Sequence, residues 1–203
     1  MDGTLSLPFR LEILALTLVG WVAIYFFVNR RQVEPHRRLD LGTELDRRTP
    51  YLTMFVPVYF STYPFTLMPF LILSDARQFY WMLVTFVSIS AVSSLIHATI
   101  PSKIERVEQV SIGGASGWIL DRFQKTCKPH GNFPSMHVAL SIPAVASCFM
   151  AFGTVVGSIT LVWAILIALS TLYTKQHYIL DVLVGFVVGM LIFSLTFWLM
   201  LAK

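Results

Sequence analysis

The chain has 203 residues, of which 56% are hydrophobic and 13% are charged, and its mean hydropathy is +0.70. Soluble domains carry about 25% charged residues, so this composition excludes a soluble globular protein and an intrinsically disordered chain. With only two cysteines, the sequence is not a disulfide-rich secreted domain either. The net charge of +4 lies in short loops between apolar blocks, which favours topology signals or ligands for an anionic substrate over nucleic-acid binding. We expect a single integral membrane domain over residues 1–203.

Stretches without charged side chains predict transmembrane helices, because a bilayer core of roughly 30 Å needs about 20 apolar residues per helix. In chain order they predict six spans, at residues 11–28, 51–73, 79–101, 133–152, 155–174 and 177–201. The 46 residues between Lys128 and Lys175 carry no formal charge, which is too many for one crossing, so we expect two spans joined near Gly153 to Gly157. The expected fold class is therefore all-α, a polytopic membrane bundle of six helices with both termini on one side.

Two long loops lie on the face opposite the termini in this plan. The first, residues 29–48, mixes six arginines with four acids, a pattern typical of a solvated surface and also of a short helix at the membrane interface. The second, residues 103–132, contains the glycine-rich segment 112–117, which lacks the Gly-Lys-Ser/Thr ending of a phosphate-binding loop.

The start of the last span holds the clearest candidates for chemistry. His177 and Asp181 are four residues apart, so both lie on one face of a helix and the carboxylate can reach the imidazole. Such a contact fixes the tautomer of the ring and makes its other nitrogen a better nucleophile or base. A structural hydrogen bond inside a bundle explains the same spacing, so the pair alone does not decide the function.

A second histidine, His137, ends the segment Phe133-Pro134-Ser135-Met136-His137, which predicts a loop followed by a helix start. We expect free backbone N–H groups here, at the positive end of the helix dipole, where they suit a phosphate. In the six-span plan this helix start lies on the same face as His177. The same face carries four cations, Lys103, Arg106, Lys128 and Lys175. Another histidine, His97 in the third span, is expected to be a packed, hydrogen-bonded residue.

At these residues the sequence resembles a known enzyme family. Pro134-Ser135-Met136-His137 resembles the Pro-Ser-Gly-His motif of the type 2 phosphatidic acid phosphatase superfamily, and Ser170-Thr171-x5-His177-x3-Asp181 is similar to its Ser-Arg-x5-His-x3-Asp motif. The details Phe-Pro-Ser-x-His and His-Tyr-x-x-Asp resemble the branch that contains inositol phosphorylceramide synthases. The resemblance implies that His177 attacks phosphorus to form a phosphohistidine and that Asp181 orients it. It also implies that His137 protonates the leaving alkoxide and later activates the acceptor.

The sequence departs from the superfamily pattern at two places. Thr171 stands where the motif has Arg, and the first motif, Lys-x6-Arg-Pro, has no full match; its nearest candidate is residues 101–106. Lys175 lies four residues after Thr171, one helical turn on, and is expected to supply the missing charge. A lysine ammonium is a point charge, whereas an arginine guanidinium can bind a phosphate through two parallel hydrogen bonds, so phosphate binding is expected to be looser. The predicted phosphate-binding set is completed by Ser135, Lys103, Arg106 and Lys128.

The sequence thus predicts a membrane-embedded lipid phosphate phosphatase that works through a phosphohistidine, without a metal or another cofactor. Its expected partners are a lipid phosphate or phospholipid substrate and the surrounding membrane lipids, not nucleic acid. One alternative is a phosphotransferase that moves a phospho-headgroup to an alcohol acceptor, as the inositol phosphorylceramide synthases do. The other is a small transporter or proton path, although four cations are more than a proton path needs.

The distribution of Lys and Arg predicts the orientation in the membrane. There are 12 on the loop face and 3 on the terminal face. The positive-inside rule then places the loop face, with both histidines, in the cytoplasm and the termini outside. The superfamily resemblance favours the opposite orientation, because many relatives work on the extracytoplasmic or lumenal face.

Overall fold

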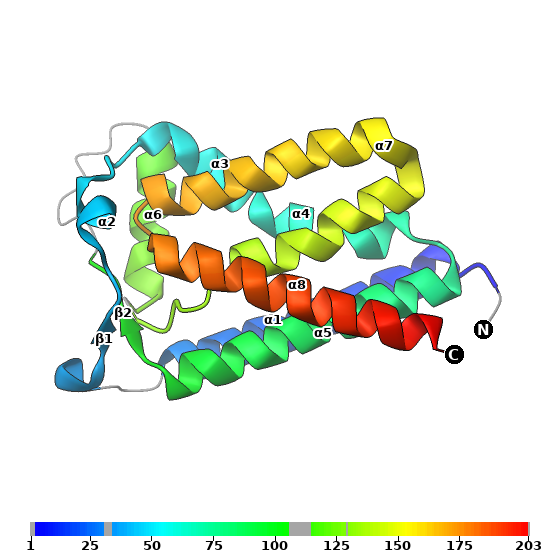
Figure 1. Ribbon diagram of the computed structural model, residues 1–203, viewed down its shortest axis with the longest axis horizontal. Coiled ribbons are helices and arrows are strands. Elements are labelled where there is room, and N and C mark those ends of the chain that lie inside the picture. The colour runs from blue at the N-terminus through cyan, green and yellow to red at the C-terminus, as the bar shows by residue number, and fades with distance from the viewer. Residues whose placement is uncertain (1–2, 31–33, 106–114, 129, 203) are drawn as a thin grey trace.

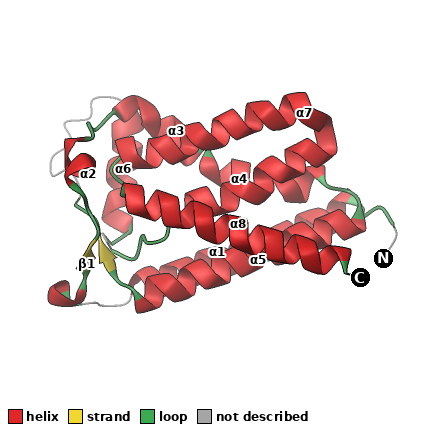
Figure 2. Ribbon diagram, viewed as in Figure 1, coloured by secondary structure: helices red, strands yellow, loops and turns green. Residues whose placement is uncertain are grey.

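The computed structural model describes residues 3–30, 34–105, 115–128 and 130–202 (Figure 1). Helices dominate this part of the chain (Figure 2), and its one sheet is a short parallel pairing of two strands. In chain order the elements are α1 (Leu7–Arg30), the 3-10 helix η1 (Pro35–Arg37), β1 (Leu39–Asp40), α2 (Glu44–Arg48), the 3-10 helix η2 (Thr53–Phe55), α3 (Val56–Phe60), α4 (Thr62–Ile72), α5 (Ala76–Thr99), β2 (Ser102–Lys103), α6 (Ala115–Thr126), α7 (Met136–Tyr173) and α8 (Ile179–Leu201). The all-α prediction is confirmed.

Five helical stretches in the described residues are long and apolar enough to cross a membrane, which is the pattern of a multi-pass membrane protein. The first is α1, and the second is the stretch Thr53–Ile72, which comprises η2, α3 and α4. The other three are α5, α7 and α8. At 38 residues α7 is longer than one crossing needs, and it is interrupted at Gly153, whose φ of 77° is a conformation that favours glycine. In Figure 1 the two arms of α7 run in opposite directions from this point.

The helices lie close to the predicted spans, and the differences are at their ends. α1 begins at Leu7, four residues before the predicted start, and so includes Arg10. The Arg10 side chain is buried, and its Nη1 donates to the carbonyls of Leu71, at 2.5 Å, and Leu73, at 3.4 Å. These carbonyls lie at the C-terminal end of α4, where helix carbonyls lack an intrahelical partner. A charge near the end of the span is therefore accommodated as a cap for the next helix.

The second long loop contains a helix, α6, that the sequence analysis did not predict. Its Gly117 and Leu120 are buried, whereas the charged Asp121, Arg122 and Lys125 are exposed, so the helix is amphipathic. In Figure 1 it lies with α2, β1 and β2 at the end of the bundle opposite the two termini. The first loop contains a short helix, α2, which begins with a capping box between Thr43 and Asp46.

The principal apolar core lies between α4, α5 and the first arm of α7. Its buried members are Phe70, Phe79, Phe86, Ile89, Ala139 and Leu140. Edge-to-face ring pairs join Phe70 to Phe79 and to Phe86, with centroids 5.8 and 5.5 Å apart. This packing fixes the first arm of α7 against α5, and with it the position of the residues at the start of α7.

Candidate active site

Two helix N-termini meet at the loop end of the bundle, and the motif histidines lie at them. α7 begins after the N-cap residue Ser135, and α8 begins after the N-cap residue Tyr178. The Ser135 N–H donates to the carbonyl oxygen of Asp181 over 2.9 Å, which ties the two helix starts together. The N–H of Ser135 itself is therefore occupied by this bond to α8, and a role of Ser135 in phosphate binding stays a prediction. The Ser135 hydroxyl is buried and has no hydrogen-bond partner among the described residues.

Two glycines on α8 permit this close approach. A methyl group added at Gly185 would lie 2.5 Å from the carbonyl oxygen of Ser135, and one added at Gly189 would lie 2.8 Å from that of Ala139. Small residues spaced by four let membrane helices approach until their backbones touch. The spacing Gly185-x3-Gly189 therefore sets how near the start of α8 lies to the start of α7.

The three motif side chains form one hydrogen-bonded row. Nδ1 of His137 lies 3.1 Å from Nε2 of His177, and Nδ1 of His177 lies 3.4 Å from Oδ2 of Asp181. His177 and Asp181 are 6% and 2% exposed. An ionised carboxylate only accepts hydrogen bonds, so the proton of a neutral His177 lies on Nδ1 and the lone pair of Nε2 faces His137. The row therefore presents a nucleophilic nitrogen at His177 Nε2, beside a donor on His137.

The backbone around His177 is held by hydrogen bonds on both sides. Oδ2 of Asp181 also accepts from the Tyr178 N–H, at 2.9 Å, so the carboxylate is fixed by the start of its own helix. The carbonyl oxygen of Thr171 accepts from the N–H groups of Gln176, at 2.9 Å, and His177, at 3.1 Å. Thr171, which replaces the motif arginine, thus holds the turn through its backbone.

His97 is packed and hydrogen-bonded, as expected. Its Nε2 lies 2.9 Å from the carbonyl oxygen of Pro134, and the residue is buried. A carbonyl only accepts, so Nε2 carries the proton and donates it. The side chain thereby fastens the loop before α7 to the end of α5.

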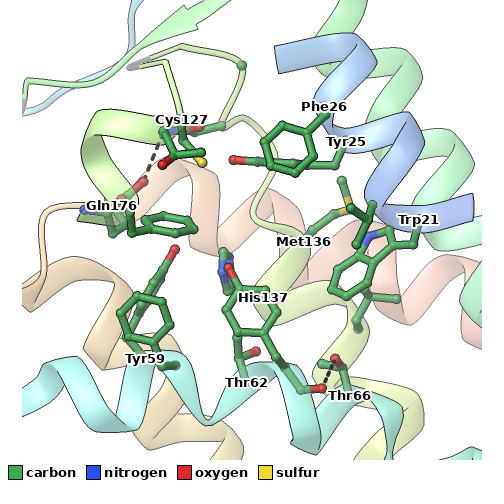
Figure 3. Close-up of a pocket in the computed structure, with 18 of the residues that line it drawn as sticks. Trp21, Tyr25, Phe26, Tyr59, Thr62, Thr66, Cys127, Met136, His137 and Gln176 are labelled. Carbon is green, nitrogen blue, oxygen red and sulfur yellow. Dashed lines mark hydrogen bonds between the residues drawn. The ribbon is translucent and has the colours of Figure 1, made fainter. Parts of the chain in front are cut away.

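His137 and His177 line a cavity of about 480 Å³ (Figure 3), a volume within the usual range of small-molecule sites. The His137 ring points into it, and the ring centroid of Tyr59 lies 4.9 Å away. The walls are largely aromatic, with Trp21, Tyr25 and Phe26 from α1, Tyr59, Phe60 and Tyr63 from α3 and α4, and Phe123 from α6. Such walls suit an apolar group bound directly beside the two histidines.

Two cations line this cavity in the described part of the chain, and sequence analysis predicted one of them. Lys128 is the predicted one; its Nζ donates to the carbonyl oxygen of Arg30 over 2.9 Å. The other is Arg122 of α6, whose guanidinium lies 5.6 Å from the Trp118 ring centroid. The sequence does carry a signal for a helix at Arg122. Apolar residues recur at helical spacing on one side of it, at Leu120, Phe123 and Cys127.

The remaining predicted phosphate ligands lie away from the cavity or outside the described residues. Lys103 pairs with Asp40, at 3.0 Å, and does not line the cavity. The Lys175 ammonium does not line it either; it donates to the carbonyl oxygen of Asp46 over 2.6 Å, and burial lowers the pKa of this lysine. Arg106 lies outside the described residues.

The described residues contain no group of three or more His, Cys, Asp or Glu side chains that could hold a metal ion. The chemistry that this geometry supports is nucleophilic attack by one histidine and proton transfer by the other.

Comparison with known protein families gives a match for the C-terminal part of the chain. The family model of the PAP2 superfamily, the type 2 phosphatidic acid phosphatases, matches residues 105–203, a range that contains both motif histidines and Asp181. No curated protein and no solved structure matches the chain, and the family match gives no evidence for the narrower resemblance to inositol phosphorylceramide synthases. Members of this superfamily are generally phosphatases or phosphotransferases. The match covers just under half of the chain and includes α6, α7, α8 and the row of hydrogen-bonded motif residues, so this part of the chain is similar to the PAP2 superfamily.

Proposed function

We propose that the protein is a membrane-embedded lipid phosphate phosphatase that forms a phosphohistidine at His177. The observation that carries this proposal is the row Asp181, His177 and His137 at the wall of an aromatic cavity. A family match to phosphatases and phosphotransferases over the same residues supports it. In this proposal the two arms of α7 cross the membrane separately, which gives six crossings.

In the first step, Nε2 of His177 attacks phosphorus and the bond from phosphorus to the lipid oxygen breaks. His137 enters as an imidazolium, gives one proton to the departing alkoxide and becomes neutral, so the lipid alcohol leaves. Because the two rings are in hydrogen-bond contact at 3.1 Å, they must separate to admit the phosphoryl group. Asp181 stabilises the positive charge that develops on the His177 ring.

In the second step, neutral His137 removes a proton from a water molecule, which attacks phosphorus. The bond between phosphorus and Nε2 of His177 breaks, inorganic phosphate leaves, and His177 returns to its neutral form. Each histidine thus ends the cycle as it began, and the net reaction consumes one water molecule. An alcohol in place of water would give phosphotransfer by the same first step.

The residues that line the cavity indicate how the proposed substrate would bind. Arg122 and Lys128 line the cavity and would neutralise the phosphate oxygens, while the aromatic side chains of α1, α3 and α4 would contact the apolar part of the lipid. Arginine forms two parallel hydrogen bonds to a phosphate where lysine forms point contacts. Arg122 on α6 therefore takes the role that the superfamily motif gives to the arginine at position 171.

The proposal is tested with purified protein in mixed micelles that contain phosphatidic acid and no divalent ions. Released phosphate and new lipid products are followed together, and the phosphoenzyme is trapped by rapid denaturation with labelled substrate. We expect phosphate release and a phosphoenzyme that His177→Ala eliminates, while His36→Ala, a change in an exposed histidine of η1, leaves both intact. Full activity in His177→Ala would end the mechanism.

A further inference from the structure

α8 begins without a local side chain that satisfies its first N–H group. Its N-cap residue is Tyr178, whereas Ser, Thr, Asp and Asn are the residues that usually cap a helix. Oδ2 of Asp181, the third residue of the helix, accepts from the N–H of Tyr178 and faces His177. The N–H of Ile179 instead donates to Oδ1 of Asp46, a residue 133 positions earlier in the chain, over 2.8 Å.

Asp46 is itself firmly held. It is 5% exposed, and its Oδ2 accepts from the N–H of Thr43, at 2.8 Å, and from the Thr43 hydroxyl, at 2.6 Å. Its backbone carbonyl accepts from the ammonium of Lys175 at 2.6 Å. The start of α2 therefore contacts the chain two residues before His177 and two residues after it.

We infer that Asp46 is a positioning residue for the His177–Asp181 pair, an inference that rests on the proposed function of that pair. Without Asp46 the Ile179 N–H would be left unsatisfied at the positive end of a helix dipole. The nearest carboxylate on the same helix is that of Asp181, and a swing toward Ile179 would take it from Nδ1 of His177. Asp46 removes this competition, so Asp181 stays on the imidazole.

This role assigns part of the site to the N-terminal half of the chain, outside the residues that match the superfamily. It also gives the Lys175 side chain a function other than phosphate binding. Through its bond to the Asp46 carbonyl, Lys175 fastens the turn that carries His177 to α2.

The test compares Asp46→Asn and Asp46→Ala with Glu44→Gln, a change in an exposed carboxylate on the same short helix. Asn keeps one acceptor oxygen for the Ile179 N–H, and Ala keeps none. We expect kcat for phosphatidic acid to fall about 10-fold in Asp46→Asn and about 100-fold in Asp46→Ala, the size of loss caused by misplacing a reacting group by about 1 Å. KM stays within about twofold because the cavity walls are unchanged, and Glu44→Gln behaves like the wild type.

A second measurement does not depend on activity. In protein with ¹⁵N-labelled histidine, the ring signals of His177, assigned by comparison with His177→Gln, report its tautomer. We expect a defined Nδ1–H form in the wild type and in Glu44→Gln, and a mixture of tautomers in Asp46→Ala, or in Asp46→Asn where the alanine variant does not fold. Unchanged ring signals and unchanged kcat in folded Asp46 variants overturn the inference. If the ring signals change as expected while the wild type hydrolyses no lipid phosphate, the proposed function fails and the positioning role stands.

Discussion

Gly185→Ala tests whether the close approach of α8 to α7 sets the geometry of the two histidines. The added methyl carbon would lie 2.5 Å from the carbonyl oxygen of Ser135 and 3.1 Å from its nitrogen. Both are backbone atoms, so no change of rotamer relieves the overlap. Ordinary contact begins at 3.4 Å, and the difference from 2.5 Å means that α8 must withdraw by about 0.9 Å at this level. Asp181 lies one turn earlier on the same helix, so the displacement reaches the His177 turn.

The assay combines phosphate release from phosphatidic acid with thermal unfolding of the purified protein. Misplacing reacting groups by about 1 Å costs about 100-fold in rate, and overpacking costs about 1–3 kcal/mol in stability. We therefore expect kcat to fall by one to two orders of magnitude and the unfolding midpoint to decrease.

Gly20→Ala is the matched control, because a methyl group at Gly20 in α1 would have nothing within 4 Å. Alanine is the better helix former, so this variant should keep wild-type kcat and an unchanged or higher midpoint. Wild-type kcat and midpoint in Gly185→Ala would refute the reasoning.

Four further outcomes are expected. His177→Ala abolishes turnover and leaves no trappable phosphoenzyme, whereas His137→Ala still captures phosphate from a substrate with a good leaving group, since a general acid contributes about 10²- to 10⁴-fold; equal loss of capture in both contradicts this division of roles. Vanadate inhibits because it reproduces the five-coordinate transition state, and chelators do not; activity lost to EDTA and restored by a divalent ion contradicts the metal-free mechanism. Hydrogen bonds from the Gly42 N–H and the Lys103 ammonium hold the pKa of Asp40 below its ordinary 3.8, so its stabilising effect is present at neutral pH and is lost as pH falls through the lowered value. Asp40→Asn therefore lowers the unfolding midpoint at neutral pH, and the gap to the wild type closes below pH 3.8; a gap that persists in acid opposes this. An alkaline phosphatase fused after Lys203 is active, because the excess of Lys and Arg on the loop face places the C-terminus outside. An inactive alkaline phosphatase, together with a fluorescent protein that is bright at the same position, would show that the C-terminus lies in the cytoplasm.

The long helices could be predicted because a membrane requires their backbone groups to be satisfied within each helix, so apolar stretches of sufficient length have few other options. The same reasoning cannot find α6, which has 12 residues and carries charges along its length. Its helix depends on burial of Leu120 against the rest of the protein, and that contact is tertiary.

The site shows the same division between local and tertiary causes. The contact of His177 with Asp181 follows from their spacing at a helix start, and the structure has it at 3.4 Å. The contact of His177 with His137 depends on how closely α8 approaches α7, which no local pattern gives. For Lys175 the helical spacing from Thr171 was misleading, because α7 ends at Tyr173 and Lys175 has a φ of 54°. Beyond the end of a helix the i,i+4 rule no longer says which way a side chain points.

The motif residues and most of the aromatic cavity walls lie in different halves of the chain, so a change of substrate selectivity need not change the motif residues. The motif residues lie in the segment that matches the superfamily, whereas Trp21, Tyr25 and Tyr59, which form walls of the cavity, lie before it. Under the proposed function, substitutions in α1 or α3 would therefore alter which lipid fits beside His137 and leave the row of hydrogen bonds to Asp181 in place. Asp46 and His97 also lie in the N-terminal half, yet Asp46 accepts from the first N–H of α8 and His97 donates to the loop before α7. The N-terminal half thus supplies cavity walls and, through Asp46, also holds the turn that carries His177.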